Sequence, residues 1–402
     1  MYSLHLSAEQ IEFRDTVRSF VDDEIKPVVL NANRLDIGDR ALPKDVLDKA
    51  SQMGLRTLAL AEELGGVGAD ALTCCIVTEE LAAGDAGIAT VLAETSALGL
   101  ALFGAMTNAQ RDAFLPAFLE DDRYHLAYAS HEPDTDTALG IDYHRTTGTA
   151  HRVRTKAERN GDSFVVSGVK DAVVNAGVAK LFAVEVDTGK GIGVLLIPAG
   201  TRGLTVNENA EPRWYHGSCG EIILQNCTVP ADSLLQGSAN LRGEPGRGAP
   251  LAQAINLGIG RAAYEAALDY ARLRVQGGRP IVEHQAIGGK LAEVAVRLEM
   301  SRNAVWQAAW ASDHPAAQAD RSLPNLPLTA MAQVFASEAI YRAVKDAAEC
   351  FGAMGVMRDM PLQKYISDAR ICLYSGDGNS DLKLRIAEQL SGHRRAPLLA
   401  AE

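Results

Sequence analysis

Three long helical segments dominate the C-terminal part of the chain and limit what it can fold into. They cover residues 251–275, 282–313 and 325–352, are rich in alanine, and are each near or above 25 residues long. Helices of this length that are apolar on more than one face pack into a bundle and leave surface for contacts between copies of a chain. We therefore expect a C-terminal helical bundle and an oligomeric protein.

Two regions of different character precede this bundle. From residue 7 to about 118, apolar residues such as Ile11 and Phe13 recur with a helical period, and two apolar helices are expected to break at Gly84. From about 124 to 237, β-branched residues alternate, and "RNGDSF" is typical of a hairpin turn. The sequence predicts an α+β chain with an all-α domain (1–123), a middle β-sheet or β-barrel-like domain (124–238) and a four-helix bundle (239–402).

Composition and charge argue against several kinds of partner. A formal net charge of −12, with no run of Lys and Arg interleaved with aromatic residues, makes nucleic acid unlikely as a ligand. The N-terminus lacks the pattern of a secretion signal, and the longest apolar stretch carries Glu94, so we expect a cytoplasmic chain without a membrane span. Six scattered Cys and nine His without ligand spacing predict buried, reduced thiols and no metal site.

Five short motifs follow one another along these three regions. They are "AYASHEP" at 127–133, "NGDSFVVSGVKDAVVNAG" at 160–177, "WYHGSCGEIILQNCTVPADSLLQG" at 214–237, "YARLRVQGGRPIVEHQAI" at 270–287 and "ECFGAMGVMRDMPLQKYISDARI" at 349–371. With the α, β, α order of the regions, they resemble the acyl-CoA dehydrogenase family over nearly the whole chain. The first motif is similar to the family's Tyr-x-x-Thr-Glu-Pro.

The resemblance implies an FAD enzyme that dehydrogenates the α,β-bond of an acyl-CoA thioester. It also implies a homotetramer, or a mixed tetramer, and an electron-transferring flavoprotein as electron acceptor. Thr137 matches a residue beside the flavin, Val174 and Asn175 match the segment beneath its ring, and Arg274 and Gln285 match residues that reach the FAD of a neighbouring subunit. The cofactor residues implied are Tyr128, Thr137, Val174, Asn175, Arg274, Gln285, Glu349, Gly352, Gly355, Asn379 and Asp381.

Several positions depart from the family pattern. Ala172 stands where the family usually has Trp, Gly277 where it has Phe, and Glu349 and Ala353 where it has Gln and Gly. Ala249 occupies the position of an Arg near the substrate carbonyl, which leaves Arg247 as the candidate for CoA, and the segment 134–157 is longer than usual. These departures weaken the case for full-affinity FAD and leave the placement of CoA open.

The stretch "SGDGNSD" at 375–381 contains the candidate general base. The family places a Glu at this point, and Asp377 matches it, with Gly378 beside it at the substrate. A thioester α-proton is too weakly acidic for a solvated carboxylate, so such a base requires a desolvated site that raises its pKa. The other interpretation is a turn whose polar residues only cap the helix that follows. The family's other base position falls near Gly248 and carries no acid.

Glu94 is the alternative catalytic residue and a candidate for substrate binding. It lies in an otherwise apolar helix that, in the family, lines the far end of the acyl pocket. Glu94 either faces solvent or an intersubunit ion pair, or faces the pocket. In the pocket an unpaired carboxylate is costly to bury, which favours a functionalised, branched or cyclic acyl group. Two further functions stay open: a same-fold enzyme of other chemistry (nitroalkane oxidase, flavin monooxygenase or carrier-protein dehydrogenase), and a non-catalytic partner subunit of a mixed tetramer.

Overall fold

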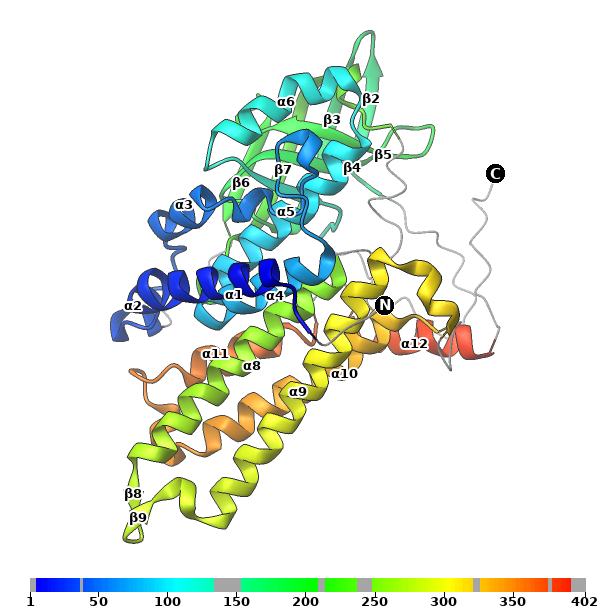
Figure 1. Cartoon of the computed structure of the whole chain (residues 1–402). Coiled ribbons are helices and arrows are strands. Elements are labelled where there is room, and N and C mark those ends of the chain that lie inside the picture. The colour runs from blue at the N-terminus through cyan, green and yellow to red at the C-terminus, as the bar shows by residue number, and fades with distance from the viewer. Residues whose placement is uncertain are drawn as a thin grey trace.

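A computed structural model shows a helical N-terminal region, a curled mixed sheet and a helical C-terminal region (Figure 1). The structure describes residues 5–36, 39–133, 153–208, 214–236, 248–320, 326–374 and 378–391, without the side chains at 248, 249, 318, 320 and 381. The arrangement agrees with the α+β architecture expected from the sequence.

The N-terminal region is built around two buried helices, α4 (Ala71–Gly84) and α5 (Ala86–Ala105). Asp85 separates them, and its side chain caps α5 by accepting from the Ile88 N–H at 2.9 Å, so the predicted break occurs one residue after Gly84. α5 is long and apolar enough to cross a membrane, but most of it is buried inside the fold, as in the core helix of a globular protein. Around this pair lie α1 (Ala8–Phe20), η1 (Val21–Ile25), α2 (Lys26–Val29), η2 (Ala32–Leu35), α3 (Lys44–Gln52), η3 (Leu55–Thr57), η4 (Glu62–Leu64) and α6 (Asn108–Glu120).

The middle region is a mixed sheet in the order β1-β4-β2-β3-β7-β6, with β5 paired to β4. The hairpin predicted from "RNGDSF" joins β2 to β3, with Asn160 opposite Ser163. β1 runs parallel to β4, whereas β3 and β7 form the long antiparallel pair. The strands are β1 (His125–Ala129), β2 (Lys156–Asn160), β3 (Ser163–Val174), β4 (Ala179–Asp187), β5 (Ile192–Pro198), β6 (Leu204–Glu208) and β7 (Cys219–Pro230), followed by η5 (Ala231–Ser233).

The C-terminal region is a bundle of α8 (Gly248–Leu273), α9 (Gln285–Asp313) and α10 (Leu328–Glu349), joined by α12 (Gly378–Ser391). α8 and α10 approach closely because Gly260 has no side chain: a Cβ there would lie 2.7 Å from Ile340 Cγ2. The other elements are β8 (Val275–Gln276), β9 (Arg279–Pro280), η6 (Ile281–Glu283), η7 (Pro315–Asp320), η8 (Gly352–Val356) and α11 (Leu362–Ile371). In Figure 1 the β8/β9 hairpin marks the end of the bundle farthest from the sheet.

A buried cluster of four ionisable residues ties these regions together. Asp85 accepts from His216 Nδ1 at 2.7 Å and lies 3.1 Å from Lys364 Nζ, which also contacts Asp368 at 2.7 Å. Asp368 in turn accepts from the Tyr215 N–H at 3.0 Å. These residues come from the α4–α5 break, the segment before β7, and α11. We call Asp85, His216, Lys364 and Asp368 the buried charge cluster.

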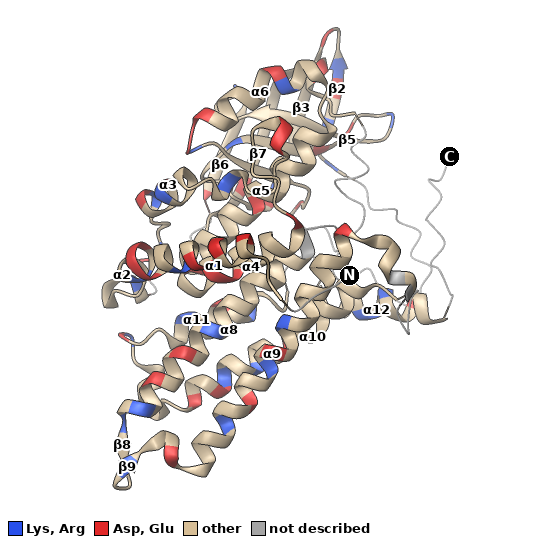
Figure 2. Cartoon of the chain, in the orientation of Figure 1, with Lys and Arg blue, Asp and Glu red and all other residues tan. Residues whose placement is uncertain are grey.

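The remaining charges and the thiols agree with the expectations from composition. Acidic side chains are frequent along α1 and the segment leading to α2 (Figure 2), including Glu9, Glu12, Asp22 and Asp23. All six cysteines are buried and none forms a disulfide, as the scattered spacing predicts.

Candidate functional site

Asn175 fastens the end of β3 to the central helix and to β1. Its side chain is fully buried, and Nδ2 lies within hydrogen-bond distance of Val91 O at 3.2 Å, Thr95 Oγ1 at 3.2 Å and Leu126 O at 3.0 Å. Thr95 Oγ1 also lies 3.2 Å from His125 Nδ1. The turn that the resemblance places beneath the flavin ring is therefore held rigidly against α5, and we call this meeting point of α5, β1 and β3 the junction.

The backbone at the end of β3 is irregular. The pairing of β3 with β7 shifts register between Lys170 and Val173, and Ala172 within this bulge has a φ of 51°. Asn175 also lies in the left-handed region, with a φ of 67°. Bulges and left-handed non-glycine residues cost conformational energy and occur preferentially next to functional sites, where they redirect side chains. The half-buried Val174, another predicted flavin neighbour, lies between the two irregular residues.

Glu94 lies at the same junction, next to Thr95 on α5. It is half-buried and makes no ion pair within the described part of the chain. Burial raises the pKa of its carboxyl to about 6, with no positive group to oppose the effect. Glu94 is therefore partly removed from solvent, unlike a fully exposed helix residue.

Two other ionisable groups near the junction, His125 and Tyr128, make contacts inside the fold. Burial, and to a lesser extent the charge of Arg56, lowers the pKa of His125 to about 3, so its ring is neutral at physiological pH. Tyr128, a predicted cofactor residue, donates from its hydroxyl to the buried carboxylate of Glu185. The described contacts of these side chains therefore point into the protein.

The first turn of α12 is fixed to α10. Gly378 has a φ of 67°, and Asn379 Nδ2 donates to Ser337 Oγ at 2.9 Å and to Glu338 Oε1 at 3.4 Å. Ser337 is fully buried, so this contact holds Asn379 in one position. Asp377, Thr137 and Arg247 lie outside the described residues, and the side chain of Asp381 is not described.

The remaining predicted cofactor residues gather at the far end of the bundle. Arg274 and Gln285 are exposed beside the β8/β9 hairpin, and Glu349 pairs with Lys290 at the end of α10. Tyr270 and Phe351 stack at 4.3 Å between ring centroids next to Gly352. Gly352, the first residue of η8, has a φ of 57°, and a Cβ on Gly355 would lie 2.7 Å from Ala348 O. The local backbone therefore favours glycine at both positions, whether or not a cofactor binds there.

One chain does not bring the two groups of cofactor residues together. Leu251, near the start of α8, lines a small hollow with Ala93 and Ser96 of α5, beside Glu94. Arg274 lies 23 residues further along the chain, which corresponds to about 35 Å at 1.5 Å per residue. A single site that used both groups would therefore need the far group from a second copy of the chain.

The far end of the bundle has features suited to such a contact. Arg274 has no ion-pair partner within the described part of the chain, and Leu273 and Val356 are 81% and 70% exposed. A free guanidinium beside apolar surface suits the diphosphate of a dinucleotide held by a neighbouring subunit, since Arg offers paired, fixed donors. At the junction, the bulge interrupts the β3 ladder just before Val174 and so leaves backbone polar groups for a cofactor. The residues present therefore fit an FAD bound between subunits.

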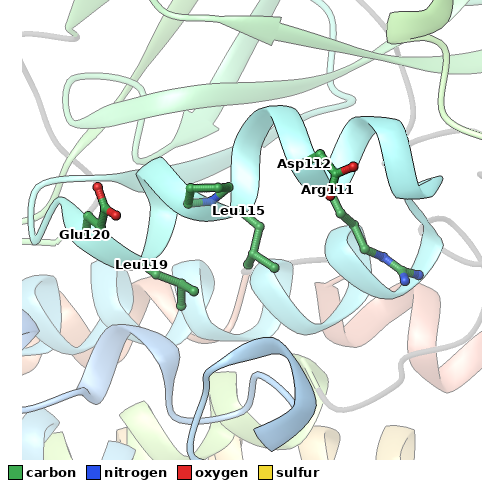
Figure 3. A pocket seen from close by; sticks show the side chains of 6 residues that line it. Arg111, Asp112, Leu115, Leu119 and Glu120 are labelled. Atoms are coloured by element: carbon green, nitrogen blue, oxygen red, sulfur yellow. The ribbon is translucent and has the colours of Figure 1, made fainter.

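Two further hollows in the described part of the chain lie away from the junction. One of about 380 Å³ is on the outer face of α6, lined by Arg111, Asp112, Leu115, Pro116, Leu119 and Glu120 (Figure 3). Another of about 280 Å³ lies between α1 and the segment 53–67, with Phe13 and Leu58 among its lining residues. Neither includes a predicted site residue, so we do not assign the active site to them.

Comparison with known proteins agrees with this architecture. Sequence profiles of the acyl-CoA dehydrogenase N-terminal and C-terminal domains match residues 7–122 and 246–390. An acyl-CoA dehydrogenase of Bacillus subtilis is 30% identical, over 97% of this chain and all of its own length. The butyryl-CoA dehydrogenase structure from Megasphaera elsdenii superposes with a TM-score of 0.82 at 25% identity, covering 97% of this chain and 100% of that one. A Mycobacterium smegmatis glutaryl-CoA dehydrogenase in complex with FADH2 shares the fold, with a TM-score of 0.83, 20% identity and coverage of 97% and 96%.

Fold and site together define a flavin-dependent oxidoreductase of three parts. The chain belongs to the acyl-CoA dehydrogenase family. This assignment confirms the predicted family, its fold, its enzyme class and FAD as cofactor. The individual site residues and the domain boundaries stay predictions.

Sequence reasoning missed two residues that position the site, Thr95 and Ser337. Each is a small hydroxyl residue, fully buried, that bonds to a predicted cofactor residue. A polar residue next to Glu94 in an apolar helix was a signal for Thr95. Ser337 has no such signal, because Asn379 lies 42 residues away in sequence.

Proposed function

We propose that this chain dehydrogenates the α,β-bond of an acyl-CoA thioester with Asp377 as the general base. Asp377 takes the α-proton while the β-hydrogen leaves with its electron pair, so two C–H bonds break and a C=C bond forms. Bound FAD supplies the acceptor for that hydride at N5. The family assignment carries this proposal, supported by the position of Asp377 directly before the fixed first turn of α12.

The anchoring of Asn379 supports Asp377 as a positioned base rather than a mobile surface acid. Gly378 separates Asp377 in sequence from Asn379, and the side chain of Asn379 is held by the buried Ser337. A general base must be held within hydrogen-bond reach of the proton it removes, and a fixed neighbouring helix limits where its carboxylate can go. Gly378 itself has a φ of 67°, a conformation that favours glycine.

Glu94 supports a substrate that is not a plain fatty acyl chain. Its carboxyl is half-buried without an ion-pair partner in the described chain, and burial raises its pKa to about 6. An apolar acyl chain ending against it would leave an ionised carboxylate uncompensated. A functionalised, branched or cyclic acyl group that donates a hydrogen bond would satisfy it, and Glu94 then selects the substrate.

We further propose a homotetramer that delivers electrons to an electron-transferring flavoprotein in the cytoplasm. Arg274 lies at the other end of α8 from the junction, so it can reach an FAD only at the junction of a neighbouring chain. This arrangement requires at least a dimer. The exposed Leu273, Val296, Met300 and Val356 supply apolar surface for that contact.

Anaerobic reduction of the flavin by substrate tests the role of Asp377. Asp377→Asn keeps the size of the side chain but removes the proton acceptor, so the rate of flavin bleaching should fall about 10²–10⁴-fold with flavin content unchanged. Ser380→Ala is the matched control, because it removes an exposed polar side chain from the first turn of α12 and should change stability by about 0.5 kcal/mol or less. If Asp377→Asn bleaches at the wild-type rate and only melts earlier, the residue caps a helix.

The partner-subunit function is kept as the second candidate because of Glu349. The Glu349 carboxylate accepts from Lys290 Nζ, and this contact lowers the pKa of Glu349. The position therefore carries an ion pair where the family has the neutral amide of Gln. A chain of this kind, purified alone, would be colourless and take up no FAD. A yellow protein with bound FAD rejects this candidate.

A further inference from the structure

His131 and Asp171 form a pair of ionisable side chains that the mechanism above does not use. Asp171 lies at the start of the β3 bulge, and its N–H donates to His131 O at 3.2 Å in the segment that follows β1. The Asp171 carboxylate accepts from His131 Nδ1. His131 and Asp171 are thus joined by one side-chain contact and one backbone hydrogen bond, and we call this pair the dyad.

The dyad rests on a rigid base. Residues next to each other in extended segments point to opposite faces, and on the other face Glu132 accepts from Lys170 Nζ at 2.8 Å and from Thr155 Oγ1 at 2.6 Å. Glu132 and Lys170 are almost fully buried, whereas the side chains of His131 and Asp171 are 45% and 32% exposed. The buried pair therefore fixes the backbone that presents the dyad to the open side.

The position of the dyad relates it to the cofactor. His131 lies three residues after Tyr128, and Asp171 three residues before Val174, so the dyad connects the two segments that the family assignment places beside the flavin. The bulge between Asp171 and Val174 has a left-handed Ala172, and such strain is characteristic of functional sites. Where the family motif has Thr, this chain has an ionisable residue.

The geometry of the pair leaves one ring nitrogen available. Because a carboxylate only accepts, Nδ1 carries a hydrogen toward Asp171, and Nε2 faces away from it. Asp171 balances the positive charge of the ring when Nε2 is also protonated, and Nε2–H then donates to an acceptor on the open side. A flavin that accepts a hydride gains one negative charge, and a donor beside the ring stabilises that charge.

We propose that His131, oriented by Asp171, contacts the FAD ring through Nε2–H and stabilises the reduced cofactor. This inference rests on the proposed function, since it requires FAD at the junction. His131 is then a cofactor-contacting residue, and Asp171 is a positioning residue that acts through it.

The test measures a flavin equilibrium rather than turnover. His131→Phe, Asp171→Asn and the double variant are reconstituted with FAD and equilibrated anaerobically with a redox dye, and the ratio of reduced to oxidised flavin is read from the visible spectrum. His131→Phe should lower this ratio about tenfold, the size expected for a lost hydrogen bond to a charged group. Asp171→Asn should lower it less, and the double variant no more than His131→Phe alone.

A remote histidine provides the control. His314→Phe, at the end of α9, should leave the ratio unchanged because its ring stacks on Trp310 away from the junction. A wild-type protein that binds FAD but whose ratio is unaffected by His131→Phe overturns this inference alone. A wild-type protein that takes up no FAD overturns the proposed function and the inference with it. If His131→Phe does not fold, an Asp171→Asn ratio equal to wild type also overturns the inference.

Discussion

Replacing Lys364 with Met should destabilise the protein strongly, because Lys364 neutralises two buried carboxylates. Its side chain is 2% exposed, and Nζ lies 2.7 Å from Asp368 and 3.1 Å from Asp85, both fully buried. Met has a similar length but no charge, so the variant leaves two buried carboxylates, with His216 beside Asp85 as the other ionisable member of the buried charge cluster. Removing one partner of a buried ion pair typically costs about 3–5 kcal/mol.

A surface lysine offers a matched control for this experiment. Lys383 contacts Glu338 at 2.6 Å, but both side chains are about half exposed, and such pairs contribute about 0–1 kcal/mol. Thermal melting at one fixed protein concentration should show a drop of about 5 °C for Lys364→Met, since the unfolding entropy of a chain of 402 residues is about 0.8 kcal/mol/K, and little change for Lys383→Met. Equal, small shifts in both variants would refute the cluster as a major source of stability. Asp368→Asn added to Lys364→Met should recover part of the loss.

The cluster also sets the pH range of stability. Burial alone would raise the pKa of Asp85, but the charges of Lys364 and His216 lower it well below its usual range. The stabilisation that Asp85 contributes is therefore complete above its pKa in the unfolded chain, about 4, and is lost as pH falls below that value. Burial alone would lower the pKa of Lys364, but Asp368 and Asp85 raise it, so its contribution is complete below about pH 10. A wild-type protein that melts at the same temperature at pH 3 and pH 7 would contradict this.

Two smaller substitutions test the junction. Glu94→Gln should stabilise the protein by about 1 kcal/mol at pH 8 and not at pH 4. Burial raises the pKa of Glu94, so the ionised form that is present at pH 8 is penalised. A loss of stability at pH 8 in thermal melting would show that the carboxylate has a favourable partner. Ala172→Gly should stabilise the protein by about 1 kcal/mol, because Gly adopts a φ of 51° without strain. A lower melting temperature of this variant would show that packing of the Ala172 methyl group contributes more than the backbone strain costs.

The helices and the hairpin could be predicted from the sequence because their signals are local. The helical period of α8, α9 and α10 and the turn in "RNGDSF" each depend on residues within one segment. The break before α5 was displaced by one residue, since Asp85 caps the second helix with its side chain. A resemblance that depends on motifs in chain order likewise requires no knowledge of their arrangement in space.

The contacts that build the site could not be predicted, because they join residues far apart in sequence. Asp85 and Lys364 are 279 positions apart, and neither stands in a motif that indicates the other. Asn175 matched the family pattern, but its bonds to Val91, Thr95 and Leu126 depend on how α5 packs against the sheet. Glu94 could face solvent or a pocket by sequence alone, and burial depends on the same packing.

The separation of Arg274 from the junction leads to a prediction about mixed oligomers. If each FAD lies at the junction of one chain and against Arg274 of another, then Arg274→Met damages the site of the neighbour, while Asp377→Asn damages its own. Arg272→Met is the control, because Arg272 is also exposed at the end of α8 and pairs there with Asp269 at 3.7 Å. It should leave FAD affinity unchanged.

Chains carrying Arg274→Met and Asp377→Asn should therefore restore activity when they are expressed together. In a mixed pair related by two-fold symmetry, one site combines the intact Asp377 of the first chain with the intact Arg274 of the second, and the other site carries both defects. Half of randomly formed pairs are mixed and each contains one complete site, so activity should reach about a quarter of wild type. Separately purified variants mixed without dissociation should show no such gain. Co-expressed chains no more active than the average of the two variants would show that each chain holds its FAD alone.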